Sequence, residues 1–180
     1  IDALYMAMPV FTRLGILYND NKYFDKMYQL YTNTKVTRKL YNTSENLWYR
    51  DESFDPPYYT PNGEDSYWSR GNGWVIAAHV LTLQLLPKNH INRNEYIETF
   101  VAMAAALKAR QQTDGFWYAS LDDPKDYGGP ETSGTAFFTY SIAWGINNGL
   151  LDSASYYPVV VRAWNALANT SVQKSGLLGY

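Results

Sequence analysis

Residues 68–87 read WSRGNGWVIAAHVLTLQLLP, and this stretch decides the fold class. From Trp74 onward, apolar residues recur at helical spacing on almost every side, and Pro87 ends the run. A helix that is apolar nearly all round must be buried on most of its sides. The stretch therefore predicts an inner helix that other helices cover.

The same order of elements recurs on both sides of this stretch, in three units of roughly 60–70 residues. Each unit holds an apolar helix, a more amphipathic helix and a turn with aromatic residues. The apolar helices are expected over residues 2–18, from Trp74 to Leu85 and from Ala136 to Leu150. The amphipathic helices are expected after Asp20 or Asn21, from Asn92 to about Arg110, and over residues 156–170. Three such hairpins predict an all-α protein, either an open solenoid or a closed α/α toroid.

Local signals set the expected ends of these helices. Asn92 and Glu95 have the spacing of a capping box, in which each side chain bonds the backbone of the other residue. Pro158 is tolerable only in the first turn of the last helix. Short extended pieces are expected near Trp48 and Trp117, because turn residues precede aromatic ones at both places.

Composition narrows the possible partners. Fifteen basic and 17 acidic residues give a net charge of -2, which offers no cationic field for nucleic acid or an anionic membrane surface. No run approaches the ~18 apolar residues of a membrane span. The chain has no cysteine, so it offers no thiolate and leaves the compartment undecided. His79 and His90 lack a second histidine at ligand spacing, so they are expected to be structural or solvated, and no metal or cofactor is expected. The aromatic fraction of 17% suits sugar stacking, or else helix interfaces.

The long loop over residues 51–69 is the segment richest in candidate functional residues. Loops of this length are usually functional, and its three prolines and several aromatic residues predict an ordered lid. The two glycines that follow Arg70 allow a sharp turn, which aims Arg70, Trp68 and Trp74 at the loop face. The planar guanidinium of Arg70 matches a carboxylate. The alternative is structural: Arg70 pairs with a nearby acid, and Trp74 lies in the core.

Three segments carry a resemblance. Residues 68–74 read WSRGNGW, residues 1–9 read IDALYMAMP, and residues 131–136 read ETSGTA. In these runs the chain resembles glycoside hydrolase family 105, the unsaturated rhamnogalacturonyl hydrolases, and the related family 88 unsaturated glucuronyl hydrolases. Residues 176–180 also resemble the start of a further family segment. The resemblance covers essentially all 180 residues and implies an (α/α)6 barrel of about twice this length.

The resemblance also implies a reaction. One aspartic acid donates a proton to C4 of a 4,5-unsaturated uronic acid, water adds at C5, and the resulting hemiketal opens and expels the attached sugar. It assigns the acid and base role to Asp2, for which the alternative is a helix N-cap. It assigns substrate binding to five residues: Met6, Arg50, Trp68, Arg70 and Trp74. Members often carry histidine where this chain has Arg50, which puts the bound sugar in doubt.

The implied barrel also bears on assembly. Both ends look cut, so residues 1–180 are expected to be a single partial domain, an incomplete barrel of about three hairpins that is inactive alone. Its uncovered inner faces predict a homodimer or an aggregating fragment. The residues expected to lie uncovered are Leu4, Met8, Phe11, Phe137, Tyr140 and Trp144. The competing interpretations are a non-catalytic carbohydrate-binding or self-assembling half-barrel, and an epimerase of the α/α-barrel type.

Overall fold

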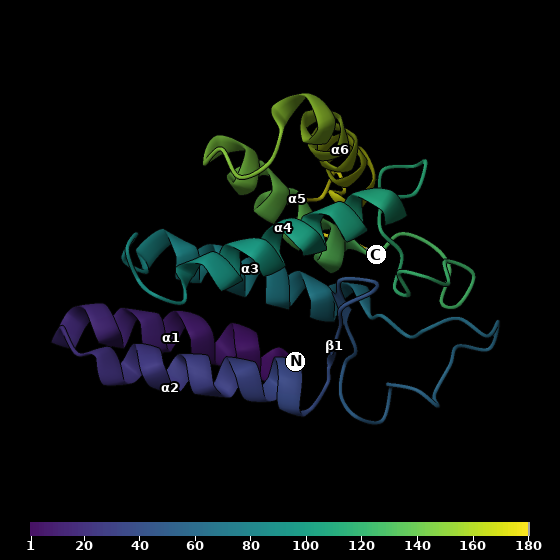
Figure 1. The fold of residues 1–180 in the computed structure, drawn as a ribbon. Helices are drawn as coiled ribbons and strands as arrows, with labels where there is room; N and C mark the ends of the chain where they lie inside the picture. The colour runs from purple at the N-terminus through teal and green to yellow at the C-terminus, as the bar shows by residue number, and fades with distance from the viewer. Residues whose placement is uncertain (180) are drawn as a thin grey trace.

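The computed structural model describes residues 1–179, and its helices fall into two layers (Figure 1). The helices are α1 (Asp2–Tyr18), α2 (Asn21–Thr32), α3 (Ser69–Leu85), α4 (Arg93–Arg110), α5 (Thr132–Asn147) and α6 (Ser153–Ala166). Short π-helical turns, η1 (Asn33–Thr37) and η2 (Leu167–Ser171), extend α2 and α6. The expected all-helical class is confirmed.

Helix α3 is the centre of the inner layer. It lies between α1 and α5, and α2, α4 and α6 each pack on the helix that precedes them. Twelve of the 17 residues of α3 are buried, as its apolar pattern predicts. The three antiparallel pairs α1–α2, α3–α4 and α5–α6 are the three predicted hairpins.

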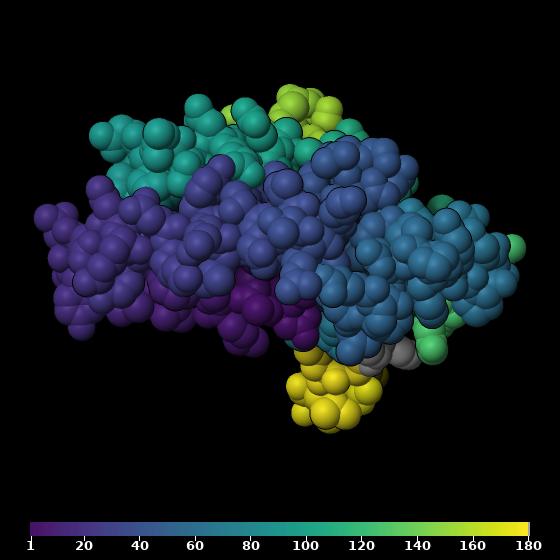
Figure 2. Space-filling model, turned by 60° about the horizontal axis from the view of Figure 1, so that its bottom comes forward, coloured from purple at the N-terminus to yellow at the C-terminus, as the bar shows by residue number. Residues whose placement is uncertain are grey.

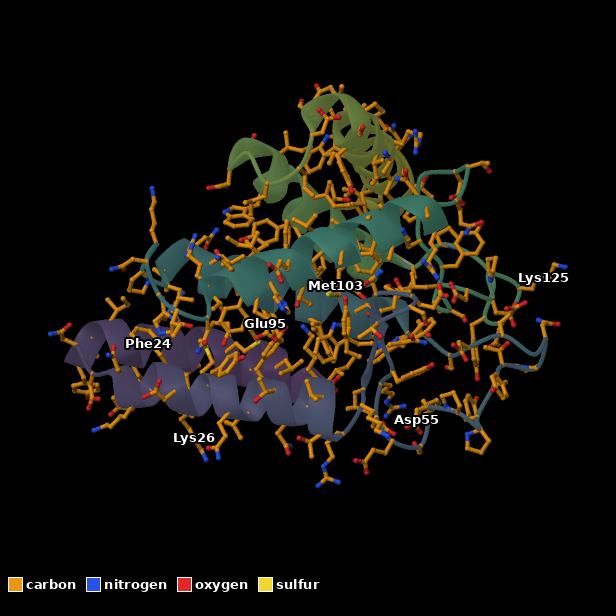
Figure 3. All side chains as sticks on the ribbon, in the orientation of Figure 1. Phe24, Lys26, Asp55, Glu95, Met103 and Lys125 are labelled. Carbon is orange, nitrogen blue, oxygen red and sulfur yellow. The ribbon has the colours of Figure 1, made fainter. Side chains whose placement is uncertain are left out.

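Part-buried polar contacts also join the outer helices α2 and α4 to each other. The Glu95 carboxylate on α4 accepts a 2.7 Å hydrogen bond from the Tyr28 hydroxyl on α2 and lies 3.3 Å from Lys35 Nζ. Figure 3 shows Glu95 and Met103 turned toward the neighbouring elements, whereas Lys26, Asp55 and Lys125 lie at the periphery. This engagement explains why the predicted capping box is wrong: Asn92 makes no side-chain cap bond, and Glu95 is used by the tertiary contact.

Two further local predictions need correction. Pro158 lies in the second turn of α6, because the helix already begins at Ser153 after its N-cap, Asp152. The carbonyl group that loses its donor belongs to Ala154, an exposed residue whose carbonyl water can reach. The extended piece near Trp48 is β2 (Leu47–Trp48), paired antiparallel with β1 (Tyr41–Asn42). Trp117 is in no strand; the isolated bridge nearby joins Trp68 and Ser120.

The uncovered surface differs from the expected one. Leu4 and Met8 are buried, because they share a side of α1 with Thr12, whose hydroxyl lies 3.1 Å from the sulfur of Met27 on α2. Phe11 and Trp144 are partly buried against the core, Phe137 is partly buried as well, and Tyr140 is exposed as predicted. The exposed apolar side chains of α1 are instead Met6, Val10, Ile16, Leu17 and Tyr18. Several of them line an apolar hollow of about 600 Å3 that also reaches Leu85.

The length and hydropathy of the helices can be compared with those that a membrane span requires. Among residues 1–179, none of the helices combines the length and the apolar character needed to cross a bilayer.

His79 is a buried structural histidine, as predicted. Its Nδ1 donates to the Val75 carbonyl at 2.8 Å, and its Nε2 lies 3.3 Å from the Tyr31 hydroxyl. Burial lowers the pKa of His79 from 6.5 to about 4, since the charged imidazolium would lose its water.

We expect this histidine to make stability fall with acidity. Between pH 6.5 and 4, the unfolded chain binds a proton that the folded chain excludes, so the unfolding free energy drops as pH falls through this window. From pH 7 to 4.5 the drop is roughly 2 to 3 kcal/mol. Urea unfolding gives the unfolding free energy of wild type and His79→Gln at pH 7 and at pH 4.5. The contribution of His79 is the extra drop between the two pH values that wild type shows. An equal drop in the two proteins would show that His79 is not held neutral.

Candidate active site

The loops that follow β2 and α4 extend from the same end of the molecule, beside the first turn of α3 (Figure 1). Between them lies a pocket of about 450 Å3. Its walls come from residues 50–58 of the first loop, residues 66–70 at the start of α3, and residues 119–131 of the second loop. Three predicted site residues line it: Arg50, Trp68 and Arg70.

The indole of Trp68 is the centre of this pocket wall. The guanidinium carbon of Arg70 lies 4.6 Å from the ring centroid, and that of Arg50 lies 5.7 Å from it. Trp74 meets Trp68 edge-on at 5.3 Å, which places the fourth predicted residue directly behind the wall. An arginine over an indole is held by the ring quadrupole and by stacking, so this pocket wall places two cations against an aromatic ring. This combination suits an anionic sugar.

Asp2 and Met6 lie outside the lining of this pocket. Both side chains are exposed near the start of α1. Asp2 is the first residue of the helix, and Ile1 occupies the cap position, so Asp2 is not the N-cap. The nitrogen of Ile1 donates to the Arg50 carbonyl at 2.9 Å, which joins this end of α1 to the pocket loop. In Figure 2 the dark purple start of the chain lies next to blue atoms of the following segment.

Glu131 is a pocket residue that the sequence analysis quoted in a motif but did not assign. Its carboxylate caps α5 by accepting from the backbone nitrogens of Ser133 at 3.1 Å and Gly134 at 2.6 Å. It also lies 3.8 Å from Arg70 Nη1. An acid just before a Thr-Ser pair at a helix start is the signal for such a cap. Glu131 thereby fixes one side of Arg70 without forming a full bidentate pair.

Asn72 is the second residue that the sequence analysis missed, and it holds the site together. It is fully buried, and its Oδ1 accepts from the Trp48 nitrogen at 2.9 Å. Its Nδ2 donates to the Trp48 carbonyl at 3.0 Å and to the Trp68 carbonyl at 3.1 Å. One amide therefore clamps β2 to the start of α3, and so positions Arg50, two residues after Trp48, against Trp68.

The glycines in these motifs serve close packing rather than a turn. Gly71 and Gly73 lie inside α3 with helical backbone, which corrects the predicted sharp turn. A Cβ at Gly73 would lie 2.9 Å from Phe137 Cβ, and a Cβ at Gly134 would overlap Ser69 Oγ and lie 2.7 Å from Glu131 Oε2. The starts of α3 and α5 approach so closely that side chains do not fit between them.

We expect Gly134→Ala to lower the unfolding free energy by about 1–3 kcal/mol, because the added methyl group overpacks this crossing. Ser69 Oγ is the nearest obstacle and has no hydrogen-bond partner within the described part of the chain. The double variant Ser69→Ala/Gly134→Ala should therefore recover part of the loss, while Ser69→Ala alone stays close to wild type. Urea midpoints of the four proteins check this. If the double variant loses as much unfolding free energy as the two single variants together, the steric explanation is excluded.

The two pocket loops are fixed to each other by hydrogen bonds. The buried Asp123 carboxylate accepts from Thr60 Oγ1 at 2.6 Å and from Asn62 Nδ2 at 2.9 Å, and these bonds lower its pKa. Beside these bonds the rings of Tyr49 and Tyr67 are stacked, and both of their hydroxyl groups donate to the Asp65 carboxylate. Burial raises the pKa of Tyr67, so its hydroxyl stays protonated. These bonds hold residues 60–62 of the first loop against the second loop, and the ordered lid over residues 51–69 stays a prediction.

Within residues 1–179, no group of three or more histidine or acidic side chains is arranged to hold a metal ion.

Comparison with known proteins gives a consistent set of similarities. The family described as Glycosyl Hydrolase Family 88 matches residues 1–180. An unsaturated 3S-rhamnoglycuronyl hydrolase from Formosa agariphila is 39% identical over 99% of this chain and 48% of its own length. A glycosyl hydrolase family 88 structure from Bacteroides vulgatus is 44% identical, with a TM-score of 0.97 over 99% of this chain and 51% of that one. A family 105 glycoside hydrolase of C. acetobutylicum ATCC 824 is 28% identical, with a TM-score of 0.78 over 98% and 51%.

These similarities confirm the predicted α/α toroid class and the family group to which the sequence motifs pointed. The matching family is 88, and family 105 is represented among the similar structures. The chain spans about half the length of the relatives it matches.

Proposed function

The chain belongs to glycosyl hydrolase family 88, and from this premise we propose that it is part of an enzyme that removes 4,5-unsaturated uronyl residues from oligosaccharides. The observation that carries the proposal is the pocket in which Arg70 and Trp68 lie together, with Trp74 behind them. A guanidinium on an aromatic wall suits a ring that carries a carboxylate. The named activity of the 39% identical relative is of the same kind.

The proposed reaction is hydration of the double bond. The Asp2 carboxyl group donates a proton to C4, and water, deprotonated by the same carboxylate, adds at C5. The C5 hemiketal then opens: its ring oxygen leaves C5, which becomes a ketone, and the resulting hemiacetal at C1 releases the attached sugar with its own oxygen. The reaction consumes one water and needs no redox partner, metal or cofactor.

The binding residues divide the sugar between them in this proposal. Arg70 holds the uronate carboxylate or a ring hydroxyl, and Glu131 orients Arg70 through the 3.8 Å contact. Trp68 and Trp74 form the wall, and Met6 covers the ring from α1. Asp2 and Met6 are exposed near the start of α1, so they reach the sugar from the side that faces solvent in this structure.

The extent of the domain and the type of substrate, both expected from the sequence, are part of the same proposal. Residues 1–180 form one partial domain, an incomplete barrel of three hairpins, and the rhamnogalacturonyl type within family 105 is the more specific alternative. The apolar hollow along α1 favours one further candidate, a self-associating half-barrel that binds sugar without chemistry. In that case the chain would bind unsaturated disaccharides without converting them.

Turnover of paired substrates tests the proposal. The full natural protein is given an unsaturated uronyl disaccharide and its saturated counterpart, and release of the second sugar is measured. We expect release from the unsaturated disaccharide alone, because protonation at C4 needs the double bond. Release from both at similar rates, or tight binding without any release, would contradict it.

A further inference from the structure

A second pocket lies where η1 meets the β1–β2 hairpin, at the end of α2 that is nearer the active-site loops (Figure 1). Its volume is about 400 Å3, within the range of ordinary small-molecule sites. It is called the η1 pocket below, and its main lining residues are Lys35, Val36, Lys39, Tyr41, Thr43 and Tyr49. It shares no lining residue with the active-site pocket, but the Tyr49 ring stacks at 4.9 Å on Tyr67, which lines that pocket. The two pockets are therefore neighbouring but separate.

The lining of the η1 pocket is basic. It contains two lysines and no acid, although the chain as a whole carries a net charge of -2. Arg38, the third cation of this segment, is paired with Glu52 at 2.9 Å. Lys39 is exposed, and within residues 1–179 its ammonium group forms no ion pair and no hydrogen bond. Lys39 is therefore available to an anion from solution.

Lys35 is the fixed cation of the η1 pocket. Its side chain is only 14% exposed, and its Nζ donates to Thr99 Oγ1 at 2.8 Å and lies 3.3 Å from Glu95. The same Nζ lies 5.0 Å from the centroid of the Tyr41 ring. An ammonium group has three N–H donors, so one remains after the bonds to Thr99 and Glu95. Lys35 is thus held in place before any ligand binds, which lowers the entropic cost of binding.

The backbone at Lys39 does not explain why a lysine stands there. Its φ is 55°, in the left-handed region, directly after Arg38 at the end of η1. Glycine or asparagine is the residue type that such a position after a helix favours. Non-glycine residues held in this region gather at functional sites, including sites that clamp ligands. A role for the lysine side chain is therefore needed.

We propose that the η1 pocket binds a uronate-containing oligosaccharide, as a second saccharide site outside the active-site pocket. The inference rests on the proposed function, which supplies uronyl saccharides as the acidic ligands of this protein. Lys39 pairs with the carboxylate, and the remaining N–H of Lys35 adds a charge-assisted hydrogen bond. Val36, which is 63% exposed, and the rings of Tyr41 and Tyr49 offer apolar contacts to the sugar. Such a site holds longer acidic saccharides close to the active-site pocket and so raises their local concentration there.

The test uses a saturated tetrasaccharide of galacturonate, which has no double bond to hydrate. Binding is measured by titration calorimetry on the full natural protein carrying Arg70→Gln, which weakens binding in the active-site pocket. Adding Lys39→Asn should raise the Kd about tenfold, and Lys39→Arg should keep most of the affinity. Because asparagine suits the left-handed backbone, Lys39→Asn should unfold at a urea midpoint at least as high as that of its parent. Lys26→Gln, at an exposed lysine of α2 outside the pocket, should leave the Kd unchanged.

Two further ligands decide what the η1 pocket recognises. An uncharged tetrasaccharide should bind at least tenfold more weakly than the galacturonate one. Equal Kd values with and without Lys39→Asn, or no binding by the Arg70→Gln protein, overturn the proposal. Displacement of the tetrasaccharide by an equal concentration of inorganic phosphate would show a site for simple anions and overturn it as well. If the natural protein converts no unsaturated disaccharide, the proposed function fails separately, and the binding measurements still decide the second site.

Discussion

Replacing Asp2 by asparagine is expected to reduce kcat on an unsaturated uronyl disaccharide by roughly 10²- to 10⁴-fold, with little change in KM. Asparagine keeps the shape of the side chain but can neither donate a proton to C4 nor accept one from water. Asp2 is exposed and caps no helix, so the substitution removes no structural contact. The loss should therefore appear in the chemical step.

The control for this variant is Asp25→Asn, which changes an exposed acid on α2 that does not line the pocket. It should retain wild-type kcat. Steady-state release of the second sugar measures both variants, and urea unfolding confirms equal stability. An Asp2→Asn protein with more than a tenth of wild-type kcat would remove Asp2 from the mechanism.

The second large effect is expected at Asn72. Asn72→Ala should lower the unfolding free energy by roughly 3–5 kcal/mol, because it leaves the buried backbone nitrogen and carbonyl of Trp48 without the side chain that bonds them. The Trp68 carbonyl loses one of the two bonds it accepts and keeps the one from the backbone nitrogen of residue 72. Because the clamp positions Arg50 beside Trp68, KM should rise as well. Urea unfolding and steady-state kinetics on the same samples check both effects.

Two variants make the Asn72 result interpretable. Asn72→Asp keeps an acceptor for the Trp48 nitrogen but loses both donated bonds. Its stability should fall between those of Asn72→Ala and wild type only if the accepted bond contributes more to stability than the two donated bonds. Asn94→Ala, at an exposed position on α4, should change stability by no more than about 0.5 kcal/mol. If Asn72→Ala is as stable as Asn94→Ala, the hydrogen bonds of Asn72 contribute nothing to the unfolding free energy.

The helices were predictable because their signals are local. The apolar run after Trp74 and the turn at residues 19–21 are readable from spacing alone, and Asp20 caps α2 as its residue type suggests. The same local logic failed for Glu95, whose carboxylate meets Tyr28 and Lys35. A pattern of spacing cannot show that a tertiary partner will compete for a capping side chain.

The site was predictable in its composition and less so in its geometry. Resemblance picked out Arg50, Trp68 and Arg70, and the structure brings these three into one pocket. The roles of Asn72 and Glu131 depend on contacts across 24 and 61 positions of the chain, respectively, and single-sequence periodicity carries no such information. The buried side of α1 was misjudged for a related reason: Leu4 and Met6 are both apolar, and the packing of α1 against α2 and α3 decides which one is covered.

Hydration of the double bond can be followed by proton NMR during a reaction in deuterated water. The full natural protein is mixed with an unsaturated uronyl disaccharide, and the vinyl proton at C4 and the release of the second sugar are recorded together. We expect the vinyl signal to disappear in step with release of the second sugar, and one deuteron to be delivered to C4. Release of the second sugar together with a uronate that still carries its double bond would show ordinary cleavage at C1 and contradict the account.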